Sequence, residues 1–470
     1  MKRKILIYIS SNLYIRNYIS TNVFAPLEAQ YECYYLLTEG VQQNDFIKNH
    51  PRFLGAIKME ANSLQRHHRL FNVLMWRHRN RSRSFYFRFL RLIHIDLLLR
   101  REKGLGYLKN WIKFLVRLIR DKEIFYCFIL GNKWIFDALF NSLFYSIPIH
   151  ADLNKHILSV HPDLIIFPSS AYDPIGNDII RIATALSVPT FFLIDNWDNL
   201  SSKSVYYIKP DFLGVWGPQS KEHAKTIHDF SESRIYCLGT PRFDKYYELA
   251  SQQLESHFNF EYVLYVGCAI AFDEATSLKL LNDEITGNPD IYGNLKIIYR
   301  PHPWRQPRDI EDYVDESKLT AIIIDPQIKP QYQKTGGDKH FQPDLGYYPS
   351  LLSNARFIVG PLTTMLIEAM IFYKKILVIT YNDGIHFTSP HNAYKYYEHF
   401  RGLDKVEGLT FAGNTNQFPL LFRKLFHDNT MLDKNKLEKD LKYFLFNDES
   451  SYSQRLVGSV DTILDSIPKN

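Results

Sequence analysis

Apolar positions along most of this chain alternate between two spacings. Two short and predominantly apolar segments, residues 163–167 and 190–194, lie on either side of residues 176–186, where apolar positions recur at helical spacing. Pro162 and Pro189 stand directly before the two runs, where strands would begin. This alternation of strand and helix predicts βαβ units and hence a parallel α/β sheet.

The second half of the chain contains the most distinct strand-helix unit, at residues 357–381. A short apolar run ends at a Gly-Pro pair, Thr363 and Thr364 follow, and a helical pattern leads into a further apolar run. A turn from a parallel strand into a helix presents backbone N–H groups where phosphates bind. The threonine hydroxyls would add donors, and Glu368 could accept both hydroxyls of a ribose. Alternatively, the threonines only cap the helix and Glu368 is solvated.

Two further strand ends carry groups that suit phosphates. Arg300 and His302 follow the apolar run at 295–299 in the order Arg-Pro-His-Pro, whose prolines fix the backbone. A cation and an imidazole held at one edge of a sheet suit a diphosphate, although an ordinary surface loop would have the same composition. Gly267 opens a turn of small residues after the run at 262–266, and phosphates could approach that backbone closely.

An acidic loop follows a predicted strand in the first half. Asp195 and Asp198 flank Trp197, which could stack on a sugar face, so the loop is expected to bind an acceptor. Asp198, and next Asp195, is the expected general base of a transfer reaction. Asp173 and Glu39 are alternative bases, and the two aspartates could instead form an Asx-type turn.

These motifs resemble those of a known group of enzymes. The His-Pro dipeptide and the hydroxyl residues opening a later helix are similar to those of bacterial GT-B glycosyltransferases, which use nucleotide-activated sugars. The most similar patterns are those of transferases of CMP-activated acidic sugars (sialyl and Kdo type) and of CDP-glycerol glycerophosphotransferases, which residues 239–244 also resemble. Glu368-Ala369 looks more like the ribose-binding carboxylate of UDP-sugar enzymes, including UDP-sugar 2-epimerases. The resemblance covers roughly residues 160–385.

The resemblance implies a GT-B architecture, with two Rossmann-like domains facing a central cleft. Because 470 residues exceed what one core usually holds, two domains are also expected from length. Residues 1–255 would bind the acceptor and carry a basic helical insertion at about 60–150. Residues 260–430 would bind the nucleotide donor, and helices at 431–470 would cross back to the first domain.

The implied activity is transfer of a sugar from a nucleotide-activated donor to a hydroxyl of a bacterial surface glycan, such as a capsule, lipopolysaccharide O-antigen or teichoic-acid-like polymer. A CDP-glycerol-type glycerophosphotransferase and a UDP-sugar 2-epimerase-like enzyme are the alternatives. The expected partners are a CMP-, CDP- or UDP-linked donor and a glycan acceptor, which could be lipid-linked. Neither a metal nor a cofactor is indicated by the sequence. The residues expected to bind the donor are Gly267, Arg300, His302, Thr363, Thr364 and Glu368.

Positive charge is concentrated in one segment. Residues 66–122 contain 16 Lys and Arg against Asp96, Glu102 and Asp121, a balance of +13, whereas the whole chain carries only +6. Aromatic residues are interleaved with these charges, and residues 107–118 have the pattern of a basic amphipathic helix. Such helices bind anionic membrane surfaces, which we favour here over a nucleic-acid groove. A helical subdomain with solvated or paired arginines is the plainer alternative.

Cysteine usage and apolar runs indicate the compartment. Cys33, Cys127, Cys237 and Cys268 lie far apart, which argues against a disulfide framework or a zinc site and for a reducing compartment. The basic N-terminus precedes too short an apolar run for a signal peptide, and no uncharged apolar segment reaches the length of a membrane span. The expected location is therefore the cytoplasm, peripherally on the inner face of the cell membrane.

Overall fold

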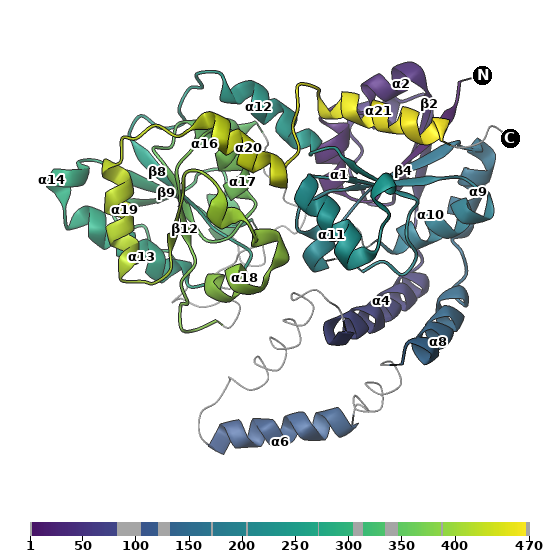
Figure 1. The fold of residues 1–470 in the computed structure, drawn as a ribbon, viewed down its shortest axis with the longest axis horizontal. Helices are drawn as coiled ribbons and strands as arrows, with labels where there is room; N and C mark the ends of the chain where they lie inside the picture. Colours follow the sequence, from purple (N-terminus) through teal and green to yellow (C-terminus); the bar gives the residue numbers. More distant parts are fainter. Residues whose placement is uncertain are drawn as a thin grey trace. The chain divides into compact units, whose positions relative to one another are not determined.

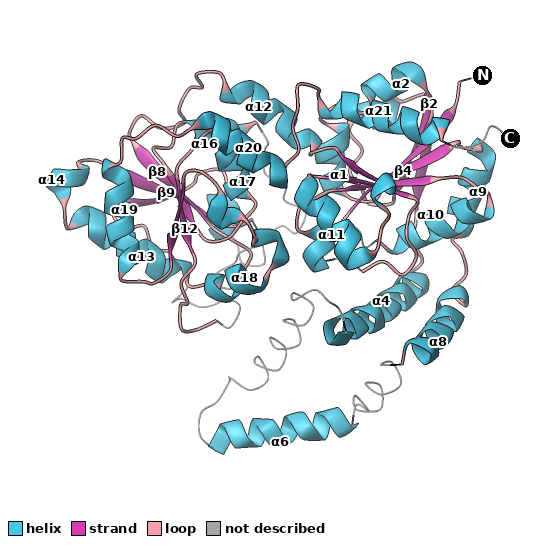
Figure 2. Cartoon of the chain, in the orientation of Figure 1, coloured by secondary structure: helices cyan, strands magenta, loops and turns pink. Residues whose placement is uncertain are grey.

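The computed structural model describes residues 2–81, 105–120, 132–170, 173–203, 205–270, 272–303, 314–333, 346–386 and 389–466. The chain forms two compact units: unit 1 contains Met1–Pro241 and Phe446–Asn470, and unit 2 contains Arg242–Leu445. Each unit is built on one parallel sheet with helices against it (Figures 1 and 2). The chain thus first crosses between units earlier than the expected 255–260, and returns later than the expected 430–431.

The sheet of unit 1 has seven parallel strands in the order β3-β2-β1-β4-β5-β6-β7. Its strands are β1 (Lys4–Ile9), β2 (Glu32–Thr38), β3 (Phe53–Ile57), β4 (Leu164–Ser169), β5 (Thr190–Ile194), β6 (Phe212–Val215) and β7 (Ile235–Cys237). The chain runs from β1 outward to β3 and then crosses to β4 on the other side of β1. Ligands of open α/β sheets bind beyond the carboxyl ends of the strands where the order reverses in this way.

Helices cover both faces of the unit 1 sheet. They are α1 (Asn12–Tyr14), α2 (Ala25–Gln30), α3 (Asp45–Asn49), α9 (Ala151–Val160), α10 (Pro174–Ala185), α11 (Pro218–His228) and α21 (Tyr452–Asp465). Because successive strand residues point to opposite faces, Ile5 and Ile7 pack with α2 and α21, whereas Leu6 and Tyr8 pack with α9 and α10. In Figure 1 the yellow α21 lies beside α2, although the two are far apart in sequence.

The expected helical insertion lies between β3 and β4. It contains α4 (Ala61–Arg81), α6 (Leu105–Arg120) and α8 (Lys133–Tyr145). One face of α8, formed by Phe136, Phe140 and Phe144, packs against Leu74 and Met75 of α4. The parts of the expected insertion at 82–104 and 121–131, including Cys127, lie outside the described residues.

The sheet of unit 2 has six parallel strands in the order β10-β9-β8-β11-β12-β13. Its strands are β8 (Tyr262–Val266), β9 (Lys296–Arg300), β10 (Ile322–Ile324), β11 (Ile358–Gly360), β12 (Ile376–Ile379) and β13 (Leu409–Ala412). The chain moves from β8 outward to β10 and returns to β11 on the other side of β8, so the order reverses between β8 and β11. The predicted βαβ unit at 357–381 corresponds to β11, a short helix and β12.

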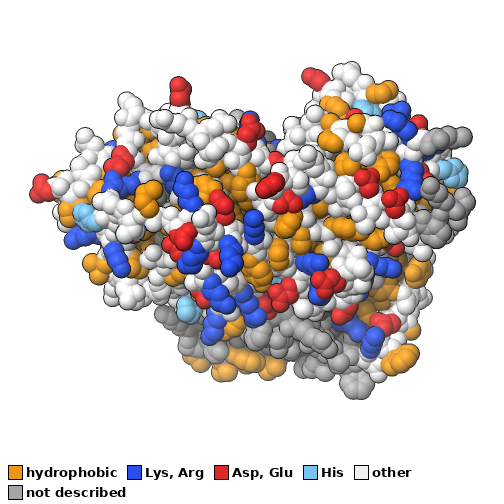
Figure 3. Space-filling view, turned by 45° about the horizontal axis from the view of Figure 1, so that its top comes forward, with side chains coloured by type: hydrophobic (Ala, Val, Ile, Leu, Met, Phe, Trp, Pro, Cys, Tyr) orange, Lys and Arg blue, Asp and Glu red, His pale blue; other side chains and the backbone are white. Residues whose placement is uncertain are grey.

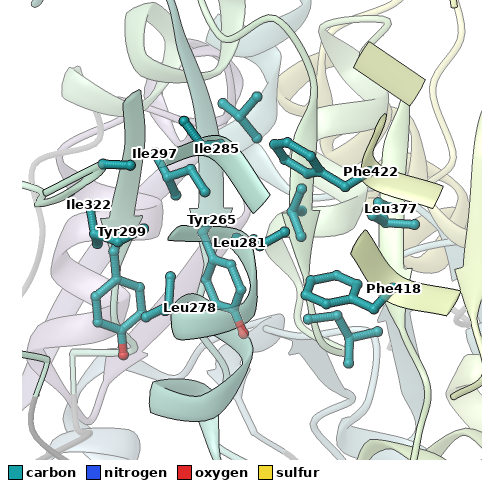
Figure 4. Packing of buried hydrophobic residues seen from close by; sticks show 14 of the residues in the cluster. Tyr265, Leu278, Leu281, Ile285, Ile297, Tyr299, Ile322, Leu377, Phe418 and Phe422 are labelled. Carbon is teal, nitrogen blue, oxygen red and sulfur yellow. The ribbon is translucent and has the colours of Figure 1, made fainter. Parts of the chain in front are cut away.

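The helices of unit 2 are α12 (Asp244–Ala250), α13 (Glu274–Thr286), α14 (Pro289–Tyr292), α15 (Lys329–Gln333), α16 (Tyr347–Ser353), α17 (Met365–Ile371), α18 (Pro390–Tyr396), α19 (Gln417–His427) and α20 (Lys434–Phe444). Leu278 and Leu281 of α13 and Phe418 of α19 pack against one face of the sheet, where they meet Tyr265 and Leu377 (Figure 4).

The C-terminal helical segment is divided between the units. Within the expected helical segment at 431–470, α20 ends at Phe444 in unit 2 and α21 begins at Tyr452 in unit 1. Ser451 and Gln454 form a capping box at the start of α21. The expected helices at 431–470 are therefore α20, which belongs to unit 2, and α21, which belongs to unit 1.

Candidate functional site

The reversal of strand order in unit 2 brings the ends of β8 and β11 together. Gly360 is the last residue of β11, and a Cβ atom there would overlap the carbonyl oxygen of Val266 at the end of β8. Only glycine allows this backbone contact without a local shift. The turns that follow the two strands therefore start side by side at the edge where α/β sheets bind ligands.

The turn after β8 is tightly fixed. The Glu274 carboxylate accepts hydrogen bonds from the backbone N–H of Cys268 (2.9 Å) and from the Tyr299 hydroxyl (2.6 Å). A Cβ atom at Gly267 would lie 3.0 Å from the backbone nitrogen of His302, so the turns after β8 and β9 pack directly together. Two of the predicted donor-binding residues, Gly267 and His302, are thus brought to one edge.

Thr363 and Thr364 stand between β11 and α17 at the same edge. Thr364 occupies the N-cap position, and its side chain makes no capping hydrogen bond. The capping explanation therefore does not account for the Thr364 hydroxyl. Both threonines are partly exposed, so their hydroxyls remain candidates for binding a ligand.

Glu368 is buried and lies beside two side chains from the start of unit 2. Its carboxylate is 3.3 Å from the Tyr246 hydroxyl, which donates to it, and 3.7 Å from Nη2 of Arg242. Burial and the nearby Glu368 carboxylate raise the pKa of Tyr246 well above its usual range, so this phenol stays a donor. Residues 239–244 stand out in the sequence, but nothing there indicates this position for Arg242, and no local pattern distinguishes Tyr246. The solvated alternative for Glu368 is wrong.

The structure corrects the interpretation of Arg300 as a phosphate ligand. Its guanidinium is 2% exposed, forms an ion pair with the buried Asp325 and donates a hydrogen bond to Oε1 of Gln327 (2.7 Å). It also lies 4.2 Å from the ring centre of Tyr348. Alternation along β9 places Arg300 on the sheet face opposite to Tyr299, so it is held in the core of unit 2.

A His-Asp pair follows β12 and was not identified from sequence as part of a site. Oδ2 of Asp383 is 2.7 Å from Nδ1 of His386 and accepts a hydrogen bond from the backbone N–H of Asp273 (3.1 Å), which lies in the loop after β8. Burial raises the pKa of Asp383, but hydrogen bonds from His386 and Ile385 outweigh it and leave the pKa lowered. The Asp383 carboxylate therefore joins the loop after β12 to the loop after β8, and β8 and β12 are the strands on either side of β11.

In unit 1, the ends of β1, β4 and β5 also meet at the reversal of strand order. Asp173 begins α10, where its Oδ1 accepts a hydrogen bond from the backbone N–H of Ile175 (3.2 Å). Burial raises the pKa of Asp173, although hydrogen bonds from Ser10 and Ile175 oppose the shift. A carboxylate with a raised pKa at this edge has the properties of a general base.

Asp195 directly follows β5, and both its carboxylate and its backbone carbonyl accept hydrogen bonds. Its carboxylate accepts a hydrogen bond from Nδ2 of the buried Asn17 (2.8 Å), and its carbonyl accepts one from Nε1 of Trp216 (3.0 Å). Asn17 was not identified from sequence, since nothing in its local pattern distinguishes it.

Asp198 starts a π-helical turn, η2 (Asn199–Lys203). Its carbonyl accepts hydrogen bonds from the hydroxyls of Ser201 (3.1 Å) and Ser202 (2.7 Å). Trp197 is 2% exposed, which contradicts the expectation that its ring could stack on a sugar. This part of the loop is therefore a hydrogen-bonded turn held through the Asp198 backbone carbonyl.

Within the described part of the chain, no cluster of three or more His, Cys, Asp or Glu side chains is arranged to hold a metal ion. None of the described helices is long and apolar enough to cross a membrane.

No protein-family model matches the chain, and no curated protein matches it. Solved structures do match. They include a Listeria monocytogenes protein assigned as a UDP-N-acetylglucosamine 2-epimerase (TM-score 0.54, 8% identity, 100% of this chain and 99% of that one). A further UDP-N-acetylglucosamine 2-epimerase gives a TM-score of 0.51 at 11% identity over 100% of this chain and 98% of that one. The fold is GT-B. The UDP-GlcNAc 2-epimerase of Methanocaldococcus jannaschii shares this GT-B fold with a TM-score of 0.50, at 11% identity over 98% of this chain and 99% of that one.

Proposed function

We propose that this protein is a glycosyltransferase that moves a sugar from a nucleotide-activated donor to a hydroxyl of a bacterial surface glycan. One observation carries the proposal. The reversal of strand order in unit 2 gathers a close-packed glycine turn, a histidine, two threonine hydroxyls and a buried carboxylate at a single sheet edge. This set has donors for phosphates and an acceptor for ribose hydroxyls.

The donor nucleotide is proposed to bind in unit 2. Glu368, oriented by Tyr246 and Arg242, would accept hydrogen bonds from the ribose hydroxyls. The hydroxyls of Thr363 and Thr364 and the imidazole of His302 would donate to the phosphates, and the backbone at Gly267 would allow them to approach. As the bond between the sugar and the phosphate breaks, these donors would stabilise the charge that develops on the departing phosphate.

The acceptor is proposed to bind unit 1. A general base removes the proton of the acceptor hydroxyl, and the oxygen of that hydroxyl attacks the anomeric carbon of the donor sugar. The bond between the sugar and the phosphate breaks, and the nucleotide leaves with its electrons. Asp173 is the carboxylate whose environment fits this role best, because its pKa is raised and it begins α10 at the edge where the strand order reverses. Asp198 and Asp195 are the candidates from sequence. The hydrogen bonds made by the Asp195 carboxylate and the Asp198 carbonyl suit residues that position the acceptor.

Calorimetric titration of CMP, CDP, UDP and GDP into the purified protein tests the donor site and shows which nucleobase it prefers. Glu368→Gln and His302→Ala should each weaken the best nucleotide by about 1–3 kcal/mol, because each removes a charge-assisted hydrogen bond. Glu438→Gln and His427→Ala, exposed residues elsewhere in unit 2, are the matched controls. Unchanged affinity in both site variants would remove the donor-site assignment.

A 2-epimerase activity is the second candidate, and the three structures named above favour it. Incubating the protein with a nucleotide sugar and no acceptor separates the two activities, since only an epimerase would form a new nucleotide sugar. For the transferase, Asp173→Asn should abolish sugar transfer while leaving nucleotide affinity unchanged. Asp198→Asn and Asp195→Asn are measured alongside it. If Asp173→Asn transfers sugar normally and one of the other two does not, the base is in the 195–198 loop.

A further inference from the structure

The helix α6 carries an uncovered apolar face. Leu105, Leu108, Ile112, Leu115 and Val116 are between 48% and 87% exposed. Their spacing of three and four residues places them on one side of the helix. Burying such side chains is favourable, so an exposed apolar face of this size indicates a partner.

Basic side chains accompany this apolar face. Lys109 and Lys113 of the same helix are exposed. Elsewhere in the insertion, Arg66 and Arg69 of α4 are exposed as well. Neither α4 nor α6 contains an acidic residue along its length. On the face of the protein drawn in Figure 3, by contrast, acidic and basic side chains are intermingled. The partner of this region is therefore expected to be both apolar and negatively charged.

The helix α8 also carries exposed apolar side chains, although its two charged residues, Lys133 and Asp137, balance each other. Its phenylalanine face packs on α4, as described above, whereas Ile135, Leu139 and Leu143 form a second apolar stripe that is exposed. Trp134, at the start of the helix, is 86% exposed, and Tyr145 at its end is also exposed. Aromatic residues with polar ring atoms favour the boundary between lipid and water.

We propose that α6 and α8 form a docking surface for an anionic lipid bilayer. At 16 residues, α6 is about 24 Å long, too short for the hydrocarbon core and suited to lying in the headgroup region. Its leucines and isoleucine would enter the acyl boundary, and Lys109 and Lys113 would contact lipid phosphates. A second copy of this chain would explain the apolar side chains but not the basic ones. A nucleic acid would explain the basic side chains but not the aliphatic ones.

Vesicle co-sedimentation of the full-length protein tests this proposal. Vesicles of phosphatidylcholine alone are compared with vesicles that also contain phosphatidylglycerol. We expect binding to the anionic vesicles and at least a tenfold fall in partition coefficient in Leu108→Glu/Ile112→Glu and in Lys109→Glu/Lys113→Glu. Leu139→Glu tests the α8 stripe separately. Leu420→Glu and Lys439→Glu, exposed on α19 and α20, are the matched controls and should bind as the wild type does.

The alternatives give different results. No binding to anionic vesicles, or equal binding by the α6 variants, overturns the proposal. Two other results, if they occur without vesicle binding, also overturn the proposal. One is RNA binding with a steep salt dependence, and the other is self-association that Leu108→Glu/Ile112→Glu abolishes. Nucleotide titration of the same variants in the absence of lipid should match the wild type. The docking surface and the proposed transferase can therefore fail independently.

Discussion

Arg300 and Asp325 show how the environment of a single residue decides its role. A basic residue after a strand of a nucleotide-binding sheet suggests a phosphate ligand. The structure instead pairs the Arg300 guanidinium with a carboxylate in the core, below the tyrosines of α16. A buried charge is retained only when it is paired, so each partner requires the other.

Arg300→Ala is therefore expected to lower the free energy of unfolding by about 3–5 kcal/mol, because it leaves the Asp325 carboxylate buried without its cation. Urea denaturation measures this loss. Lys436→Ala, which breaks the exposed pair with Glu407, is the control and should change stability by less than about 1 kcal/mol. A well-folded Arg300→Ala protein that no longer binds nucleotide would restore the ligand interpretation.

His67 of α4 and Asp178 of α10 form a second buried pair, with Nε2 of His67 3.9 Å from Oδ1 of Asp178. Burial, reinforced by Arg181, lowers the pKa of His67 from 6.5 to about 4. Burial also raises the pKa of Asp178 from 3.8 to about 6, against the effect of Arg181. The His67 contribution to stability is complete above pH 6.5 and is lost as the pH falls towards 4. The Asp178 contribution is complete below pH 3.8 and is lost as the pH rises towards 6.

The two contributions oppose each other between pH 4 and 6.5, so the wild-type stability should change little with pH there. Asp178→Asn leaves only His67 to titrate, and its free energy of unfolding should fall by up to about 3 kcal/mol between pH 6.5 and 4. His67→Gln should show the reverse slope. Thermal or urea unfolding at several pH values measures both, and parallel curves for all three proteins would contradict the pairing.

At the scale of elements, the ligand edge of unit 2 depends on contacts between neighbouring strand ends. The strands β8 and β11 approach each other at Gly360, and Asp383 joins the loop after β12 to the loop after β8. The proposed nucleotide site is thus held by backbone contacts rather than by the donor residues themselves.

Gly360→Ala should therefore destabilise unit 2 by about 1–3 kcal/mol and weaken nucleotide binding, since the added Cβ meets the backbone of Val266 and the strands must separate. Two glycines with open space around their Cα atoms provide controls. Gly413→Ala should be close to neutral, and Gly458→Ala, within α21, should stabilise by up to about 1 kcal/mol. Urea denaturation and nucleotide titration of the three variants check the order, and an unaffected Gly360→Ala protein would show that the contact is not tight.

At the scale of the whole molecule, the last helix completes a core that begins at the first strand. Leu456, Val460 and Ile463 of α21 are buried among residues of β1, β2 and α2. The core of unit 1 is therefore complete only when α21 is in place, whereas unit 2 is continuous in sequence.

Leu456→Ala is expected to lower the free energy of unfolding of unit 1 by about 2–5 kcal/mol, as for other large-to-small changes in a core. Hydrogen exchange should show faster exchange in β1 and β2 and unchanged exchange in β8 and β9. Leu420→Ala, at an exposed leucine of α19, is the control. Equal loss of protection in both units would mean that they unfold together.

The sequence alone was sufficient for the parallel α/β architecture, because burial on both faces makes each strand a continuous apolar run. The runs at 190–194 and 262–266 became β5 and β8 without change. It also placed Gly267, His302, Thr363 and Thr364 at strand ends, since parallel strands share one carboxyl edge. Local pattern carries this information because the period of apolar residues reports the element that they form.

Only the tertiary structure decided which polar side chains are buried and what they contact. Arg300 and Trp197 lie at or just after strand ends and Glu368 lies in a helix, yet all three are buried. Glu368 also contacts Arg242 and Tyr246, which come from a distant segment. Such contacts depend on strand order and on which face of the sheet a residue occupies. Neither property is encoded in local spacing, because each is fixed only when segments far apart in the chain pack together.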